Sequence, residues 1–141
     1  MFLLDTNVIS ELRRLDKADR NVVNWAGTHS AASFFISAVS IFEIELGALL
    51  IARKDQAQGN ALRTWIDHQI LPRFEGRVLA IDTAVAQRCA RLHVPNPRAD
   101  RDALIAATAL IHGLSVVTRN EADFASTGVV MINPWKLQQS G

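Results

Sequence analysis

The chain has 141 residues, of which 49% are hydrophobic and 21% charged, and this balance excludes a disordered chain. Its 15 basic and 14 acidic residues give a formal charge of +1, so no global field directs it to nucleic acid or membrane. The length predicts one domain, residues 1–141, whose core needs no metal or disulfide. Cys89 is the only cysteine, which excludes an internal disulfide and a thiolate zinc site.

The apolar stretches predict neither export nor membrane insertion. Asp5 interrupts the apolar opening after four residues, and no basic leader precedes it. The most apolar stretch, residues 36–52, contains Glu43 and Glu45, whereas a membrane span is nearly free of charge. We therefore expect a cytoplasmic protein that does not enter a membrane.

In chain order, short apolar runs alternate with longer helical patterns. The runs predict strands at residues 1–4, 33–37, 78–81, 114–117 and 129–132. The patterns between them predict helices from about residue 8, around 22–26 (opened by Asp16 or Asp19), and at 39–53, 56–71, 83–92, 103–112 and 121–124. Pro72 should end the fourth helix, and Gly113 should follow the sixth. Uniformly apolar strands separated by helices predict a three-layer α/β/α domain with a five-stranded parallel sheet.

Polar residues gather where the predicted strands end, which is where open parallel sheets bind ligands. Asp5 follows the first strand, Glu43 lies in the first turns after the second, and Asp123 comes shortly after the fourth. Asp102 opens the helix that leads into the fourth strand. These four acids can meet at one edge of the sheet.

Each acid also has a structural interpretation. Asp5 could cap the helix that follows it, and Asp102 could be a cap for which Asp100 competes. Asp123 could be a solvated acid. Glu43 lies in an otherwise apolar helix, and periodicity alone does not say whether it or Glu45 faces the site.

Four carboxylates in one cluster would repel one another strongly, since each close pair costs roughly 4 kcal/mol at an effective dielectric of about 20. They must be protonated, separated or neutralised by a cation. Oxygen ligands favour Mg²⁺ first and Mn²⁺ second. The four histidines form no pair at ligand spacing, and the signatures of serine nucleophiles and phosphate-binding loops are missing, which argues against a zinc hydrolase and the common nucleotide-binding classes.

Four blocks of sequence, in this order, resemble the PIN-domain ribonucleases, and within them the VapC-type toxins of type II toxin–antitoxin pairs. The blocks cover residues 3–10, 37–47, 102–109 and 118–123, and the ending at 132–135 resembles the FitB-like subgroup. The resemblance implies metal-dependent cleavage of RNA, a homodimer or larger toxin–antitoxin assembly, and inhibition by a small antitoxin.

The resemblance also assigns roles to residues. The four family acids match Asp5, Glu43, Asp102 and Asp123, and the polar supporting positions match Asn7 and Thr118. As a hypothesis, Asp5, Asp102 and Asp123 hold Mg²⁺, and Glu43 orients or deprotonates the attacking water. Proximity to these blocks makes Arg119 and Arg101 the candidates for binding substrate phosphates.

Two other functions stay open at this point. A magnesium-dependent phosphotransferase with Asp5 as nucleophile would need a second Asp where Asn7 stands. A non-catalytic binding module would use its acids only as helix caps and would not respond to Mg²⁺.

Overall fold

The computed structural model describes residues 1–136 and contains one five-stranded sheet. The strand order is β3-β2-β1-β4-β5, and every neighbouring pair is parallel. The strands are β1 (Phe2–Leu4), β2 (Phe34–Ser37), β3 (Val78–Leu79), β4 (Ser115–Val117) and β5 (Met131–Ile132). The predicted α/β fold with a five-stranded parallel sheet is therefore confirmed.

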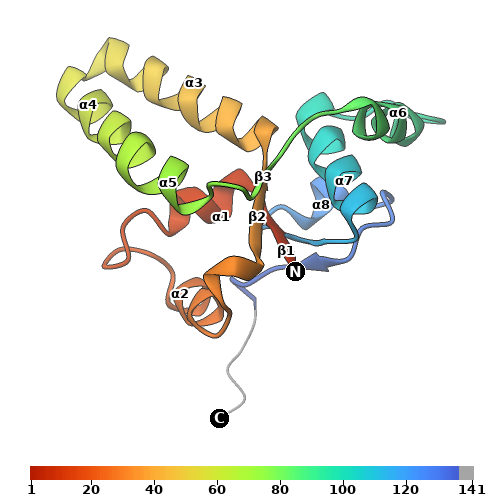
Figure 1. The fold of residues 1–141 in the computed structure, drawn as a ribbon, viewed down its shortest axis with the longest axis horizontal. Helices are drawn as coiled ribbons and strands as arrows, with labels where there is room; N and C mark the ends of the chain where they lie inside the picture. The colour runs from red at the N-terminus through yellow and green to blue at the C-terminus, as the bar shows by residue number, and fades with distance from the viewer. Residues whose placement is uncertain (137–141) are drawn as a thin grey trace.

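Helices connect the strands and cover both faces of the sheet (Figure 1). They are α1 (Thr6–Glu11), α2 (Arg20–Gly27), α3 (Ala38–Lys54), α4 (Gln56–Trp65), α5 (Leu71–Arg73), α6 (Thr83–Leu92), α7 (Asp100–His112) and α8 (Glu121–Phe124). A 3-10 turn, η1 (Ala31–Ser33), precedes β2, and a π-helical turn, η2 (Ile66–Ile70), follows α4. Within residues 1–136, no helix combines the length and apolar character that crossing a membrane requires.

Two buried clusters, one on each face of the sheet, form the core. Successive strand residues point to opposite faces. Leu3 and Val116 therefore pack with residues of α6, α7 and α8, whereas Leu4 and Val117 pack with residues of α1, α2, α3 and α4. All four side chains are at most 3% exposed. Helices on both faces make three layers, as predicted.

Side-chain caps set the start of most longer helices. The side chains of Asp19, Ser37, Asp55 and Asp82 each accept a hydrogen bond from a backbone N–H of the helix that follows. Asp19, and not Asp16, is thus the cap of α2. At the other end of α7, Gly113 adopts the left-handed conformation, with φ 68°, that terminates a helix most easily in glycine.

α3 and α4 form an antiparallel arm that extends away from the sheet (Figure 1). Their backbones approach so closely that a Cβ on Gly59 would lie 2.4 Å from the Cβ of Ala52. Arg63 of α4 joins the two helices, because its guanidinium contacts Glu45 at 2.5 Å and Asp67 at 2.7 Å. Hydrogen bonding to Arg63 lowers the pKa of both Glu45 and Asp67. The arm is therefore held by close backbone contact and paired charges.

The predicted helix end before Pro72 is wrong. The helical path continues through η2 and α5 to Arg73, and the N–H of Leu71 bonds to the carbonyl of Ile66 in the π-helical pattern. Pro72 stands at the start of α5, where its missing N–H costs little, and the N–H of Phe74 bonds to the carbonyl of Ile70 at 3.1 Å. The π turn lets the chain pass the proline without a break.

Other predicted boundaries were wrong by one to three residues. Ser33 belongs to η1, residues 80 and 81 lie beyond β3, and β4 and β5 begin one and two residues later than predicted. The central strand β1 has only three residues, so β2 and β4 can form only a short ladder of hydrogen bonds with it. Asp100 begins α7, so Asp102 lies inside the first turn and does not open the helix.

Candidate functional site

The candidate site lies at the edge of the sheet where the strands end. Because the strands are parallel, β1, β2 and β4 all end there. β1 leads into Asp5, β2 leads into the first turns of α3, and β4 leads into Thr118. A backbone bond of 2.9 Å from the Asp5 N–H to the carbonyl of Val117 fixes two of these ends to each other.

Asp5 is the most constrained of the four acids and is only 6% exposed. One carboxylate oxygen accepts the backbone N–H of Thr6 at 2.8 Å. The other accepts the hydroxyl of Thr118 at 2.8 Å and the amide of Asn7 at 3.1 Å. Asp5 thus caps α1, as its structural interpretation predicted, and it also lies at the centre of the site. Burial raises its pKa, against the effect of the Thr118 and Thr6 hydrogen bonds, and the charges of Glu43 and Asp123 raise it further.

Glu43 faces the same site from α3. The hydroxyl of Thr6 donates to its Oε1 at 2.8 Å, and the hydroxyls of Thr6 and Ser40 lie 3.0 Å apart. On its other side, Glu43 lies 3.8 Å from the guanidinium of Arg101. The structure therefore decides between the two glutamates of α3, because Glu45 pairs with Arg63 in the arm.

Asp102 and Asp123 complete the acidic group from α7 and α8. Burial raises the pKa of Asp102 to about 6, and the charges of Asp123, Asp5 and Glu43 add to this effect. Asp123 itself is exposed in the first turn of α8. The charges of Glu43 and Asp123 thus reach both Asp5 and Asp102, although the four acids come from four separate elements.

Thr118 and Asn7 support Asp5, and the two arginines lie at the rim. Thr118 is fully buried, and its hydroxyl also accepts the N–H of Asn120 at 3.0 Å. The Asn7 oxygen accepts the N–H of Arg119 at 3.3 Å, and the Arg119 guanidinium lies 5.3 Å from the ring centre of Trp135. The Arg101 guanidinium lies over Phe42 at 4.8 Å while it faces Glu43. Arg101 therefore offsets part of the charge of the acids.

Two hydroxyl residues that were not predicted from the sequence also belong to the candidate site. Thr6 and the fully buried Ser40 hold Glu43 in place. The signal was present, because Ser40 and Glu43 are three residues apart and so share a helix face. Cys89 also has a neighbour that the sequence did not reveal, since His93 Nε2 lies 3.9 Å from its Sγ. Burial raises the pKa of the Cys89 thiol, which does not favour a nucleophile.

The donor set suits a hard cation. Asp5, Glu43, Asp102 and Asp123 offer only oxygens, and burial together with nearby like charges raises the pKa of Asp5 and Asp102, an effect that a bound cation would offset. Among residues 1–136, however, no group of three or more His, Cys, Asp or Glu side chains is arranged so that it could hold an ion. The residues therefore fit a cation that uses one or two carboxylates and keeps several waters, as Mg²⁺ does.

Comparison with known proteins agrees with this arrangement. The profile of the PIN domain family matches residues 2–130. The chain is 38% identical to Toxin FitB of Neisseria gonorrhoeae and 33% identical to the VapC ribonuclease Y4jK of Sinorhizobium fredii, in both cases across 96% of this chain and 99% of the relative.

Solved structures share the fold over almost the whole chain. The structure of FitAcB from Neisseria gonorrhoeae superposes with a TM-score of 0.88 at 36% identity and covers 97% of this chain and 100% of that chain. A toxin–antitoxin complex from Klebsiella pneumoniae superposes with a TM-score of 0.70 at 26% identity over 97% of this chain and 100% of that chain. The sequence match and the shared fold together show that this chain belongs to the PIN domain family.

Proposed function

We propose that this protein is a divalent-metal-dependent endoribonuclease that acts as the toxin of a toxin–antitoxin pair. One observation carries the proposal: four acids from separate elements share one edge of the sheet, and the pKa of two of them is raised. An acidic group that one arginine compensates only in part, beside a polar, hydrogen-bonded frame, is typical of a metal-assisted phosphodiesterase. Relatives named as a toxin and as a ribonuclease support the same reading.

The ligands of Mg²⁺ or Mn²⁺ would come from Asp5, Asp102 and Asp123, of which one or two carboxylates would hold the cation while water fills its other positions. When bound, the cation would supply charge neutralisation at the phosphate and make a water molecule more acidic. Thr118, Asn7 and the Thr6 backbone fix the Asp5 carboxylate by three hydrogen bonds before any ligand arrives. Glu43, held by Thr6, would orient the attacking water and accept its proton.

The phosphotransferase alternative is not favoured by the geometry around Asp5. Both of its carboxylate oxygens accept hydrogen bonds, and the residue at position 7 is an amide donor instead of a second acid. Trapping of a phospho-aspartate at Asp5 would reverse this judgement.

The test of the proposed function is Asp5→Asn, because it removes the charge and keeps the shape. We expect RNA cleavage to fall by at least about a hundredfold, the lower range for loss of a group that acts in catalysis. We also expect Mg²⁺ to raise the Tm of the wild type and not of the variant. Asp16→Asn, which removes an exposed acid in the loop after α1, is the matched control. Retained cleavage in Asp5→Asn, or a wild-type Tm that ignores Mg²⁺, would favour the non-catalytic binding module.

An antitoxin partner is supported by an apolar groove on the face covered by α1, α2 and α4. The groove encloses about 530 Å³, and its lining includes Leu12, Leu15, Trp65 and Phe74. Trp65 is buried in the wall of this groove. An amphipathic helix of the antitoxin would fit such a groove.

A homodimer is supported by large apolar side chains exposed on α3. Phe42, Leu49 and Leu50 are 52%, 62% and 53% exposed. Exposed apolar side chains gathered on one helix are typical of a protein interface. We expect the wild type to be a dimer in light scattering and the double variant Leu49→Glu, Leu50→Glu to be a folded monomer. A variant that stays dimeric would show that a different surface forms the dimer.

A further inference from the structure

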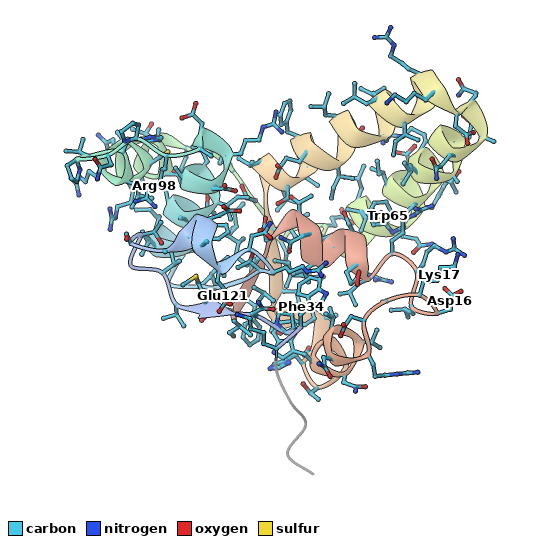
Figure 2. All side chains as sticks on the ribbon, turned by 180° about the vertical axis from the view of Figure 1, so that it is seen from behind. Asp16, Lys17, Phe34, Trp65, Arg98 and Glu121 are labelled. Atoms are coloured by element: carbon cyan, nitrogen blue, oxygen red, sulfur yellow. The ribbon has the colours of Figure 1, made fainter. Side chains whose placement is uncertain are left out.

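A second charged hollow lies outside the acidic site. It encloses about 450 Å³ between the end of α6, the loop that follows and the segment after α8. Its lining includes the three arginines Arg88, Arg91 and Arg98 and the hydroxyl of Ser126. Within residues 1–136, this hydroxyl makes no hydrogen bond. Figure 2 shows Arg98 beside α6, on the side of the molecule away from the α3–α4 arm. We call this hollow the arginine pocket.

The charge of the arginine pocket is uncompensated. Residues 86–99 contain three arginines and His93 but no Asp or Glu. Within residues 1–136, neither Arg88 nor Arg91 forms an ion pair, and the nearby Asp100 contacts His93 at 3.5 Å. The pocket is therefore prepared for an anion.

One arginine of the pocket is fixed in place by backbone carbonyls. Arg98 donates from Nε to the carbonyl of Leu92 at 2.9 Å and from its guanidinium to the carbonyl of Ala125 at 3.1 Å. These bonds use two of its five N–H donors and leave the others for a ligand. They also join the loop before α7 to the segment after α8.

Both segments lead directly to acids of the candidate site. Arg98 is four residues before Asp102, and Ser126 is three residues after Asp123. From the length of an extended chain, the Cα atoms of these pairs lie at most about 14 Å and about 11 Å apart. A nucleic-acid strand whose phosphate lies at the acids can therefore reach the pocket within a few nucleotides.

We propose that the arginine pocket binds a backbone phosphate of single-stranded RNA, within a few nucleotides of the bond that is cut. This inference rests on the proposed ribonuclease function and identifies where the affinity comes from. The acids repel RNA, so binding needs cations outside them, and guanidinium groups match phosphate oxygens in geometry. Ser126 adds a neutral donor at the same pocket.

The experiment measures binding of a labelled single-stranded RNA in the non-cleaving Asp5→Asn background. Arg88→Gln and Arg91→Gln are added together, and binding is followed over a range of salt concentrations. We expect affinity to fall roughly tenfold for RNAs of unrelated sequence and the slope of log K against log salt to become shallower by about 0.7, the value for one lost phosphate contact on a single strand.

A matched control removes the same charge elsewhere. Arg53→Gln with Lys54→Gln changes two exposed residues at the outer end of α3, far from α6 (Figure 1). We expect this variant to bind RNA like the Asp5→Asn parent. Circular dichroism and Tm should be unchanged in both double variants, because all four side chains lie outside the core.

Two outcomes would contradict RNA binding at the arginine pocket and leave the proposed ribonuclease function standing. One is an Arg88→Gln, Arg91→Gln variant that binds RNA like the control while wild-type protein still cleaves RNA. The other is a loss of affinity confined to duplex DNA of the same length. If wild-type protein cleaves no RNA with Mg²⁺ or Mn²⁺, the proposed function fails and the pocket proposal fails with it.

Discussion

Two groups of acids, on neighbouring parts of the molecule, behave in opposite ways. At the sheet edge, burial and like charge raise the pKa of Asp5 and Asp102. In the α3–α4 arm, hydrogen bonds from Arg63 lower the pKa of Glu45 and Asp67. Glu43 and Glu45 are two residues apart on one helix and yet belong to different groups. The comparison shows that the groups around an acid, more than its residue type or its neighbours in sequence, decide whether its pKa is raised, as in the candidate site, or lowered, as in a structural ion pair.

The sharpest way to break this comparison is to exchange the two glutamates of α3 for glutamine, one at a time. We expect Glu43→Gln to reduce RNA cleavage by about a hundredfold, since it removes the proposed proton acceptor. Glu45→Gln should keep the wild-type rate, because its partner Arg63 lies in the arm. Single-turnover cleavage assays measure both. An equal loss in the two variants would show that the arm and the site are one functional unit.

A second variant tests whether the arm can be loosened without damage to the site. Gly59→Ala places a Cβ 2.6 Å from the backbone Cα of Ala52, where little can yield. Overpacking of this kind costs about 1–3 kcal/mol, which exceeds the gain of about 1 kcal/mol that alanine brings to a helix. We therefore expect a lower free energy of unfolding in urea, with RNA cleavage retained at low temperature.

The control for this variant is Gly47→Ala on α3, where an added Cβ has no neighbour within 4 Å. It should stabilise the protein slightly through helix propensity alone. If Gly59→Ala were as stable as Gly47→Ala, the close approach of α3 and α4 would not be what holds the arm.

The smallest effect we predict is a change of stability with pH that depends on Asp102 and tests the pKa difference between the two groups of acids. The folded-state pKa of Asp102, about 6, is above its ordinary value of 3.8. Its ionisation therefore opposes folding, and metal-free protein should lose stability as pH rises from about 4 to about 6. The lowered pKa values of Glu45 and Asp67 act in the reverse sense, because their stabilisation is lost as pH falls.

Asp102→Asn separates these opposing contributions. With EDTA at pH 7, we expect its Tm to exceed that of the wild type by a few degrees, roughly 1 kcal/mol after allowance for partial exposure of Asp102. Near pH 4 the difference should disappear. Differential scanning calorimetry at both pH values measures this. A variant that melts below the wild type at pH 7 would show that Asp102 stabilises the metal-free fold.

Much of the fold was predictable because it depends on local patterns. All five strands form within two residues of the bounds that the sequence predicts. Asp19, Asp82 and Gly113 lie at helix ends, as capping chemistry requires. The path through Pro72 was not predictable, since it depends on a π turn that no composition signal announces.

The candidate site divides in the same way. The positions of Asp5 and Thr118 follow from strand ends alone, because a parallel sheet brings such residues to one edge. The choice between Glu43 and Glu45 does not, since it depends on the angle at which α3 leaves β2 and on Arg63, which is 18 residues from Glu45. The roles of Thr6 and Ser40 were not predicted for a related reason. They depend on hydrogen bonds between α1 and α3, which the sequence of neither helix reveals.

The strand order has a consequence for synthesis on the ribosome. β1 pairs with β4, and the hydrogen bond between Asp5 and Thr118 spans 113 residues. At a typical elongation rate of 5–20 residues per second, about 10 s pass between the emergence of the two partners. A nascent chain that ends before β4 lacks both this bond and one flank of the central strand. The acids can therefore reach the arrangement seen here only after β4 and Thr118 have been synthesised.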